Sequence, residues 1–184
     1  AMHLLLTLLG AVLSSLMVSS EVQPQADFDV QAIAGKWYLI GIATDAQWFV
    51  SHRASMKMGT AMITPTADGD VEMSYSSLSP NGSCWRMNNL AKKTEIPGKK
   101  ARFNHLVCWG YLSDLRMVDV KYDEYALIHS IKTKGKESYV VNKLYGNMVQ
   151  EKFIQFSLQS SIQPENIVIL PKNGTFTSEM FYLK

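Results

Sequence analysis

The sequence has few of the residues on which several functions depend. It has only two cysteines and four scattered histidines in 184 residues, and none of them has the spacing of a zinc site. The 18 lysines and arginines nearly balance the 16 aspartates and glutamates, and no basic run exceeds a Lys-Lys pair. A nucleic-acid surface usually shows a basic stripe, and a nucleotide site a glycine-rich fingerprint. We therefore expect no metal, no cofactor and no nucleic-acid partner.

Long apolar runs are also missing, with one exception at the start of the chain. Leu4 to Val18 is almost wholly apolar, and Ser19 and Ser20 supply the small residues of a cleavage site. The run is shorter than the ~20 residues that a membrane-spanning helix needs. It therefore predicts a signal peptide over residues 1–22, followed by a secreted, extracellular domain over 23–184. A membrane anchor is the alternative, although we expect no stable membrane insertion.

Secretion gives meaning to two further features. Asn81 and Asn173 each begin an Asn-Gly-Ser/Thr tripeptide, which is an acceptor for N-glycosylation in a secreted chain. Cys84 begins one expected strand and Cys108 ends the next, so the two fall almost opposite each other across a hairpin. A disulfide between them is plausible in an oxidising compartment. Free thiols, a bond between two chains and a catalytic Cys108 remain alternatives.

Most of the chain alternates between apolar and polar residues, with turn residues every 8 to 14 positions, which is typical of antiparallel strands. Unpaired sheet edges invite aggregation, and closing the sheet into a barrel removes them. Eight strands enclose just enough space for one small ligand. The expected strands cover residues 35–44, 56–66, 71–78, 84–93, 100–108, 115–122, 125–133 and 138–145.

The period changes after the eighth strand. Residues 148–162 place apolar side chains at helical spacing, and Pro164 ends the pattern before a short strand at 167–170. The apolar stripe of this helix needs a surface to cover, and the outer wall of the barrel is available. The sequence thus predicts an all-β fold, an eight-stranded antiparallel up-and-down barrel with one C-terminal α-helix packed on the outside. His129 should face this helix.

Alternation also predicts which side chains point into the barrel. Several of them are small and leave volume, and the methionines among them are adaptable. A solid core built from the same side chains is the alternative interpretation. Trp48 is expected in a loop at the mouth. The expected inward residues are Leu39, Gly41, Ala43, Gly59, Ala61, Ile63, Met73, Tyr75, Met87, Asn89, Leu115, Met117, Ile128, Val141, Lys143 and Tyr145.

Lys143 is the exception in this otherwise mostly uncharged set. An inward ammonium group is costly unless an anion pairs with it. Lys143 either meets the carboxylate of a ligand or extends to the rim of the barrel, and the sequence does not choose between the two. Arg102 is a second candidate, but its facing depends on the register of the fifth strand.

Two ordered motifs give the chain a family resemblance. Gly35-Lys36-Trp37 opens the first strand, and Tyr122-Asp123-Glu124-Tyr125-Ala126 joins the sixth strand to the seventh. With the late helix, these segments resemble the lipocalin family over about residues 26–171. The resemblance implies a cup-shaped barrel with Trp37 as an apolar plug at its closed end, and structural roles for Gly35, Tyr122, Asp123 and Tyr125. A third family motif places an arginine on this tryptophan, but residues 143–147 contain none.

Within the family, the chain resembles a fish-type member of the lipocalin-type prostaglandin D synthase branch, through segments such as Ala43–Trp48 and Pro65–Gly69. That enzyme's chemistry needs a cysteine thiolate in the cavity. The position that matches this cysteine is Gly59. The enzyme's neighbouring site residues correspond to Leu39, Ala61 and Tyr75 here, and only Tyr75 has a hydroxyl. We therefore expect no catalytic residue. The family's usual disulfide partner for Cys84 is also absent, since no cysteine follows Cys108.

Three functions remain to be compared. The first is extracellular binding and transport of a small hydrophobic ligand of the retinoid, fatty acid, bile pigment or steroid class. The second is prostaglandin-H2 D-isomerase activity, which Gly59 argues against. The third is a defence protein that binds a siderophore or a partner protein, such as a cell-surface receptor or a second copy of the chain.

Overall fold

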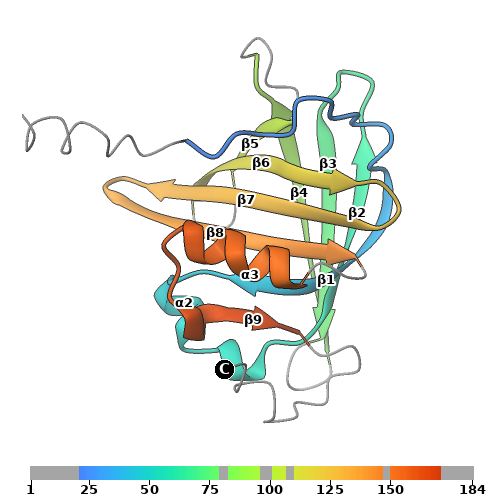
Figure 1. Cartoon of the computed structure of the whole chain (residues 1–184). Coiled ribbons are helices and arrows are strands. Elements are labelled where there is room, and N and C mark those ends of the chain that lie inside the picture. The colour runs from blue at the N-terminus through green and yellow to red at the C-terminus, as the bar shows by residue number, and fades with distance from the viewer. Residues whose placement is uncertain (1–20, 79–82, 96–100, 107–109, 147–149, 171–184) are drawn as a thin grey trace, which may run out of the picture.

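The computed structural model describes residues 21–78, 83–95, 101–106, 110–146 and 150–170. Residues 1–20 of the expected signal peptide, both expected glycosylation sites and Cys108 lie outside these residues. Antiparallel strands dominate the described chain (Figure 1). They are β1 (Gly35–Ala43), β2 (Gly59–Pro65), β3 (Val71–Leu78), β4 (Cys84–Lys93), β5 (Arg102–Leu106), β6 (Leu112–Lys121), β7 (Tyr125–Lys134), β8 (Glu137–Gly146) and β9 (Ile167–Ile169).

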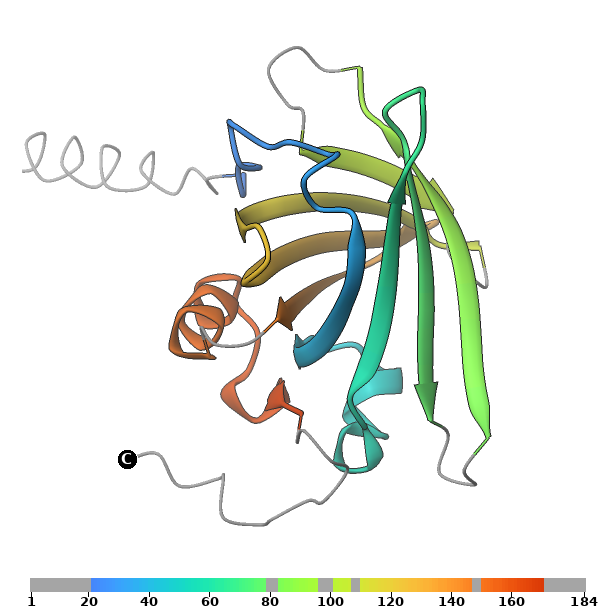
Figure 2. The ribbon, with the colours of Figure 1, turned by 90° about the vertical axis from the view of Figure 1, so that its right-hand side faces the viewer.

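The sheet closes on itself because β1 pairs with strands from both ends of the meander. Consecutive strands pair from β2 to β8, and β1 then joins β8 to β2. Its first half, Gly35–Leu39, lies beside β2, and its second half lies beside β8 on one edge and β9 on the other. Figures 1 and 2 show the strands wrapping around a common interior. The predicted eight-stranded barrel is confirmed, with β9 as an additional strand.

The predicted helix packs on the outer wall as α3 (Gln150–Gln159). Phe153 on this helix is fully buried, and a side chain at Gly41 would meet its ring at 2.9 Å. The glycine therefore lets the helix approach β1 closely. One detail of the expected apolar face is wrong, because Leu158 is 39% exposed whereas Ser157 is buried.

A β-bulge in β1 changes the facing of its second half. The register of β1 against β8 shifts between Leu39 and Gly41, so the simple alternation stops there. Ala43 packs with Phe153 on the outside of the wall, and Ile42 packs with the interior residue Val141. The predicted inward positions of Gly41 and Ala43 are therefore wrong, and Ile42 takes that role.

A buried polar network lies between the barrel wall and α3. The imidazole Nδ1 of His129 is 2.7 Å from Oδ1 of Asn142, and the Asn142 amide donates hydrogen bonds to Ser157 and Ser160. Phe156 of the helix contacts the His129 ring edge to face. His129 thus faces the helix as predicted. Ser157 is buried because its hydroxyl accepts one of these hydrogen bonds.

The closed end of the barrel is built around Trp37. Its side chain is buried in one cluster with Phe28, Ile33 and Phe103, and its indole N–H donates to the Ile33 carbonyl at 2.9 Å. In the described part of the chain no lysine or arginine lies over the Trp37 ring, consistent with the missing third motif. Apolar packing and one hydrogen bond therefore hold the plug.

Residues just before the first strand cross the outside of β6. Arg116 is buried there, and its guanidinium donates to the Val22 carbonyl and pairs with Glu21 and Asp114, each at 2.8–2.9 Å. Arg102 forms a bidentate salt bridge with Asp114 on the same outer face. The Arg102 side chain therefore points away from the barrel interior and does not line the cavity.

Candidate functional site

A small cavity lies in the half of the barrel nearer its mouth. Its volume is about 30 Å³, and the six strands β3 to β8 supply its polar and apolar lining. A cavity of this size holds about two water molecules. The lining residues are Tyr75, Met87, Asn89, His105, Leu115, Ile128, Ser130, Lys132 and Lys143.

Lys143 supplies the cation of this cavity. It lies on β8, opposite Ile128 of β7, and its ammonium group is 4.8 Å from the centre of the Tyr75 ring. Among the described residues it has no carboxylate partner. Burial, helped by the nearby charge of Lys132, lowers the pKa of Lys143 to about 7. The Tyr75 ring stabilises the charged form of Lys143 only in part, so binding of an anion beside the ammonium group would still be favourable.

Two polar groups in the cavity lining have no partner. Nδ1 of His105 and the amide nitrogen of Asn89 are both buried without a hydrogen bond in the described structure. His105 is only 6% exposed, and burial is the main cause that lowers its pKa to about 4, with Lys132 and Lys143 adding to the effect. An unpaired buried polar group costs about 1–3 kcal/mol, so these groups favour a ligand that can hydrogen-bond to them.

The interior below the cavity is filled. Tyr145 and Tyr75 share a hydrogen bond, and burial raises the pKa of both phenols, which therefore stay neutral. Met73 and Met117 are fully buried beside them. The space expected from the small residues is thus largely occupied by these four larger side chains. A ligand longer than a few atoms must displace flexible side chains, and unbranched methionines can move most easily.

The structure brings most of the expected inward residues into one interior. Alternation within β7 also identifies Ser130 and Lys132, two and four residues beyond Ile128, which the sequence analysis left out. His105, which the sequence pattern did not place in the interior, also lines the cavity. The core and cavity hold Leu39, Ala61, Ile63, Met73, Tyr75, Met87, Asn89, Leu115, Met117, Ile128, Val141, Lys143 and Tyr145.

The backbone around Gly59 leaves little room for a side chain. A Cβ atom there would lie 2.9 Å from the Ser76 carbonyl oxygen of β3. A cysteine at this position would therefore require β2 and β3 to shift. Cys84 is exposed at the start of β4, has no disulfide partner among the described residues, and does not line the cavity. Because Cys108 is outside the described residues, the predicted disulfide stays a prediction.

Aromatic side chains surround the mouth of the barrel. Trp48 lies on α2 (Gln47–Val50), is 45% exposed and hydrogen-bonds to Tyr139. Tyr139 in turn contacts Tyr111 edge to face. Trp85, which is 49% exposed, occupies the face of β4 that also carries Met87. A ligand entering the cavity would pass these rings.

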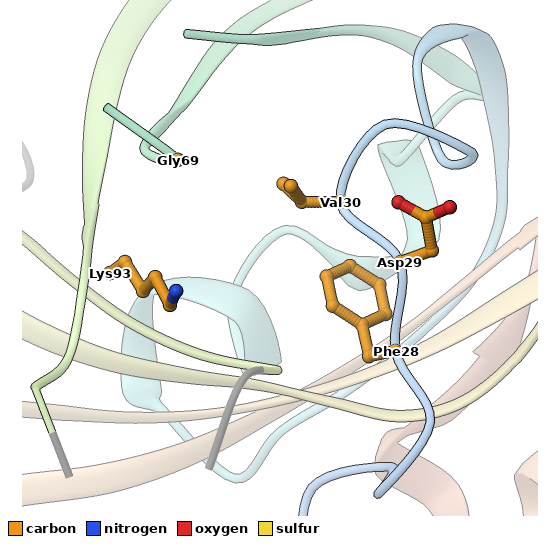
Figure 3. Close-up of a pocket in the computed structure, with 5 residues that line it drawn as sticks. All are labelled: Phe28, Asp29, Val30, Gly69 and Lys93. Atoms are coloured by element: carbon orange, nitrogen blue, oxygen red, sulfur yellow. The ribbon is translucent and has the colours of Figure 1, made fainter. Parts of the chain in front are cut away.

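A larger hollow of about 340 Å³ lies outside the barrel, at its closed end (Figure 3). Phe28 and Val30 of the N-terminal segment face Gly69 and Lys93 across it. The Asp29 carboxylate points away from Lys93 and accepts a hydrogen bond from the Gln31 backbone. The hollow has no converging polar groups, so the barrel cavity is the better candidate site.

The described residues contain no group of three or more histidine, cysteine, aspartate or glutamate side chains that could hold a metal ion. Nor does any described helix have the length and apolar character needed to cross a membrane.

Comparison with known proteins defines the class. The model of the lipocalin / cytosolic fatty-acid binding protein family matches residues 34–174, and the chain belongs to this family. It is 36% identical to "Lipocalin" of Rhinella marina over 183 residues, which cover 96% of this chain and 98% of that protein.

Two further likenesses are weaker. The chain is 28% identical to "Prostaglandin-H2 D-isomerase" of Equus caballus, over 95% of this chain and 94% of that protein. A solved structure titled "The Siderocalin Ex-FABP functions through dual ligand specificities" matches with a TM-score of 0.66 and 24% identity. The match covers 76% of this chain and 94% of that one. At this identity the structural match supports the fold alone.

Proposed function

We propose that the protein is a secreted carrier that binds a small hydrophobic molecule inside the barrel. The observation that carries the proposal is the cavity enclosed by β3 to β8, in which the apolar side chains of Met87, Leu115 and Ile128 lie beside convergent polar groups. The apolar segment at residues 4–18 supports an extracellular location. Membership of the lipocalin family supports the same type of function.

Isomerase activity is less well supported than transport. The enzymes named prostaglandin-H2 D-isomerase among the relatives resemble this chain over nearly its whole length. However, Gly59 occupies the position that the resemblance assigns to the nucleophile, and its backbone crowds any side chain against Ser76. Conversion of prostaglandin H2 by the purified protein would contradict this interpretation.

Filling the cavity should abolish ligand binding. Ser130→Phe places a ring in the cavity, whereas Ile131→Phe, one residue along β7, adds the same ring on the opposite face of the strand. Binding of the neutral probe Nile red, followed by its fluorescence, should weaken by about tenfold or more for Ser130→Phe only.

Thermal unfolding of both variants checks that they fold. Equal affinities for the two variants would place the ligand outside the barrel. If the unmodified protein bound neither Nile red nor any of several retinoids and fatty acids, the carrier function would be wrong.

A further inference from the structure

We infer that the ligand carries an anionic head group, such as a carboxylate, which binds in the barrel cavity at Lys143, Asn89 and His105 with its apolar tail toward the mouth. This inference rests on the proposed carrier function and specifies the class of ligand. It follows from three features of the described residues.

The first feature is the imbalance of charge around the cavity. Lys143 lines it, and none of the described lining residues is an aspartate or a glutamate. Among the described residues, the Lys143 ammonium group contacts the ring of Tyr75 and no carboxylate. A desolvated cation without a counter-ion is expensive, and a ligand carboxylate would supply the missing charge.

The second feature is the set of unsatisfied polar groups. The Asn89 amide nitrogen is a donor, and a neutral imidazole offers one N–H. Together with the Lys143 ammonium, they give up to three donors from β4, β5 and β8 around one small space. A carboxylate has about four acceptor positions and can accept from all three, whereas an alcohol or a hydrocarbon cannot.

The third feature is the size and position of the cavity. Its 30 Å³ suits about one carboxylate group but no whole lipid. Tyr145 and Met117 close the interior on the side of the plug, and the exposed rings of Trp48 and Trp85 lie on the other side. The head group therefore enters first, and the tail extends past the aromatic mouth.

A matched pair of ligands tests this inference. Dodecanoate and 1-dodecanol differ only in the head group, and calorimetric titration at pH 6 gives both affinities. We expect the acid to bind at least about tenfold more tightly than the alcohol. Lys143→Met should remove this preference and leave 1-dodecanol binding nearly unchanged, because methionine keeps most of the apolar stem.

Lys36→Met is the control, since Lys36 also lies over a tyrosine ring, that of Tyr38, but on the exposed outer surface. This variant should keep the full preference for the acid. Thermal unfolding of both variants verifies the fold. Binding of acid and alcohol with equal affinity, or a preference that survives Lys143→Met, would overturn the inference and leave the carrier function standing. Failure of both ligands to bind would instead contradict the carrier function.

The preference for the acid should also depend on pH. A pKa near 7 means that free Lys143 loses its proton above neutrality, so binding the anion there requires proton uptake. The facing groups Tyr75, Tyr145 and His105 keep their neutral forms between pH 6 and 9, and Lys132 lies beside them. Dodecanoate affinity should fall by up to about tenfold per pH unit above pH 7.

Binding of 1-dodecanol serves as the reference, because it should stay constant over the same range. The measurement is calorimetric titration of both ligands from pH 6 to pH 9, with Lys143→Met in parallel. A dodecanoate affinity that does not change with pH, or the same decline in Lys143→Met, would contradict the assignment of the head group to Lys143.

Discussion

Replacing Trp37 by alanine is expected to lower the free energy of unfolding by about 3–5 kcal/mol. The indole is buried at the closed end among Phe28, Ile33 and Phe103, and its N–H satisfies the Ile33 carbonyl. Alanine would leave a cavity as well as an unpaired carbonyl. No arginine covers this ring in the described residues, so the apolar contacts and the one hydrogen bond carry its contribution.

Urea unfolding followed by circular dichroism measures this loss. Trp48→Ala is the matched control, because Trp48 is 45% exposed at the other end of the barrel. Its removal should cost less than about 1 kcal/mol. If Trp37→Ala cost no more than Trp48→Ala, the plug at the closed end would not be an important part of the core.

Gly146→Ala is expected to destabilise the protein by about 4 kcal/mol or more. Gly146 ends β8 with a φ of +102°, a conformation that residues with a Cβ rarely adopt. Its Cβ would also collide with the Glu124 carbonyl and lie 2.8 Å from the Cα of Tyr125. Because both contacts are backbone atoms of the β6–β7 turn, they can move only if the turn moves.

Gly135→Ala separates the cost of the positive φ from the cost of the collision of the Cβ atom with the backbone. Gly135, in the β7–β8 turn, also has a positive φ, +59°, but a Cβ there would meet nothing within 4 Å. It should therefore cost only the conformational penalty, about 1–2 kcal/mol. Thermal or urea unfolding of both variants gives the difference. Equal losses would mean that the crowding at the end of β8 is relieved without cost.

The strands and the outer helix could be predicted because their signals are repetitive. Alternation over eight segments and a change of period after residue 146 sufficed for the barrel, within a few residues at each boundary. The helix α2 (Gln47–Val50) is one turn long and has no period to detect. The bulge after Leu39 was also invisible, since it depends on where β1 exchanges one neighbour for another.

The site was predicted less completely than the fold. Lys143 was recognised because alternation continues without interruption along β8. His105 was missed because β5 is short, and its pairing to β4 involves only Lys92 and Lys93. With so few residue pairs, the sequence pattern does not determine the register of β5 against β4. The fullness of the interior depends on side-chain rotamers of Tyr75 and Tyr145, which no pattern of residue types reveals.

If the predicted signal peptide is removed, the segment that crosses β6 makes the position of the cut matter for stability. Cutting before Glu21 would keep its carboxylate and the Val22 carbonyl on Arg116. Removing residues 1–22, as the sequence pattern suggests, would strip both acceptors from a guanidinium whose Nε already has none. Under the predicted processing, a cut after Val22 instead of before Glu21 would therefore leave a less stable protein.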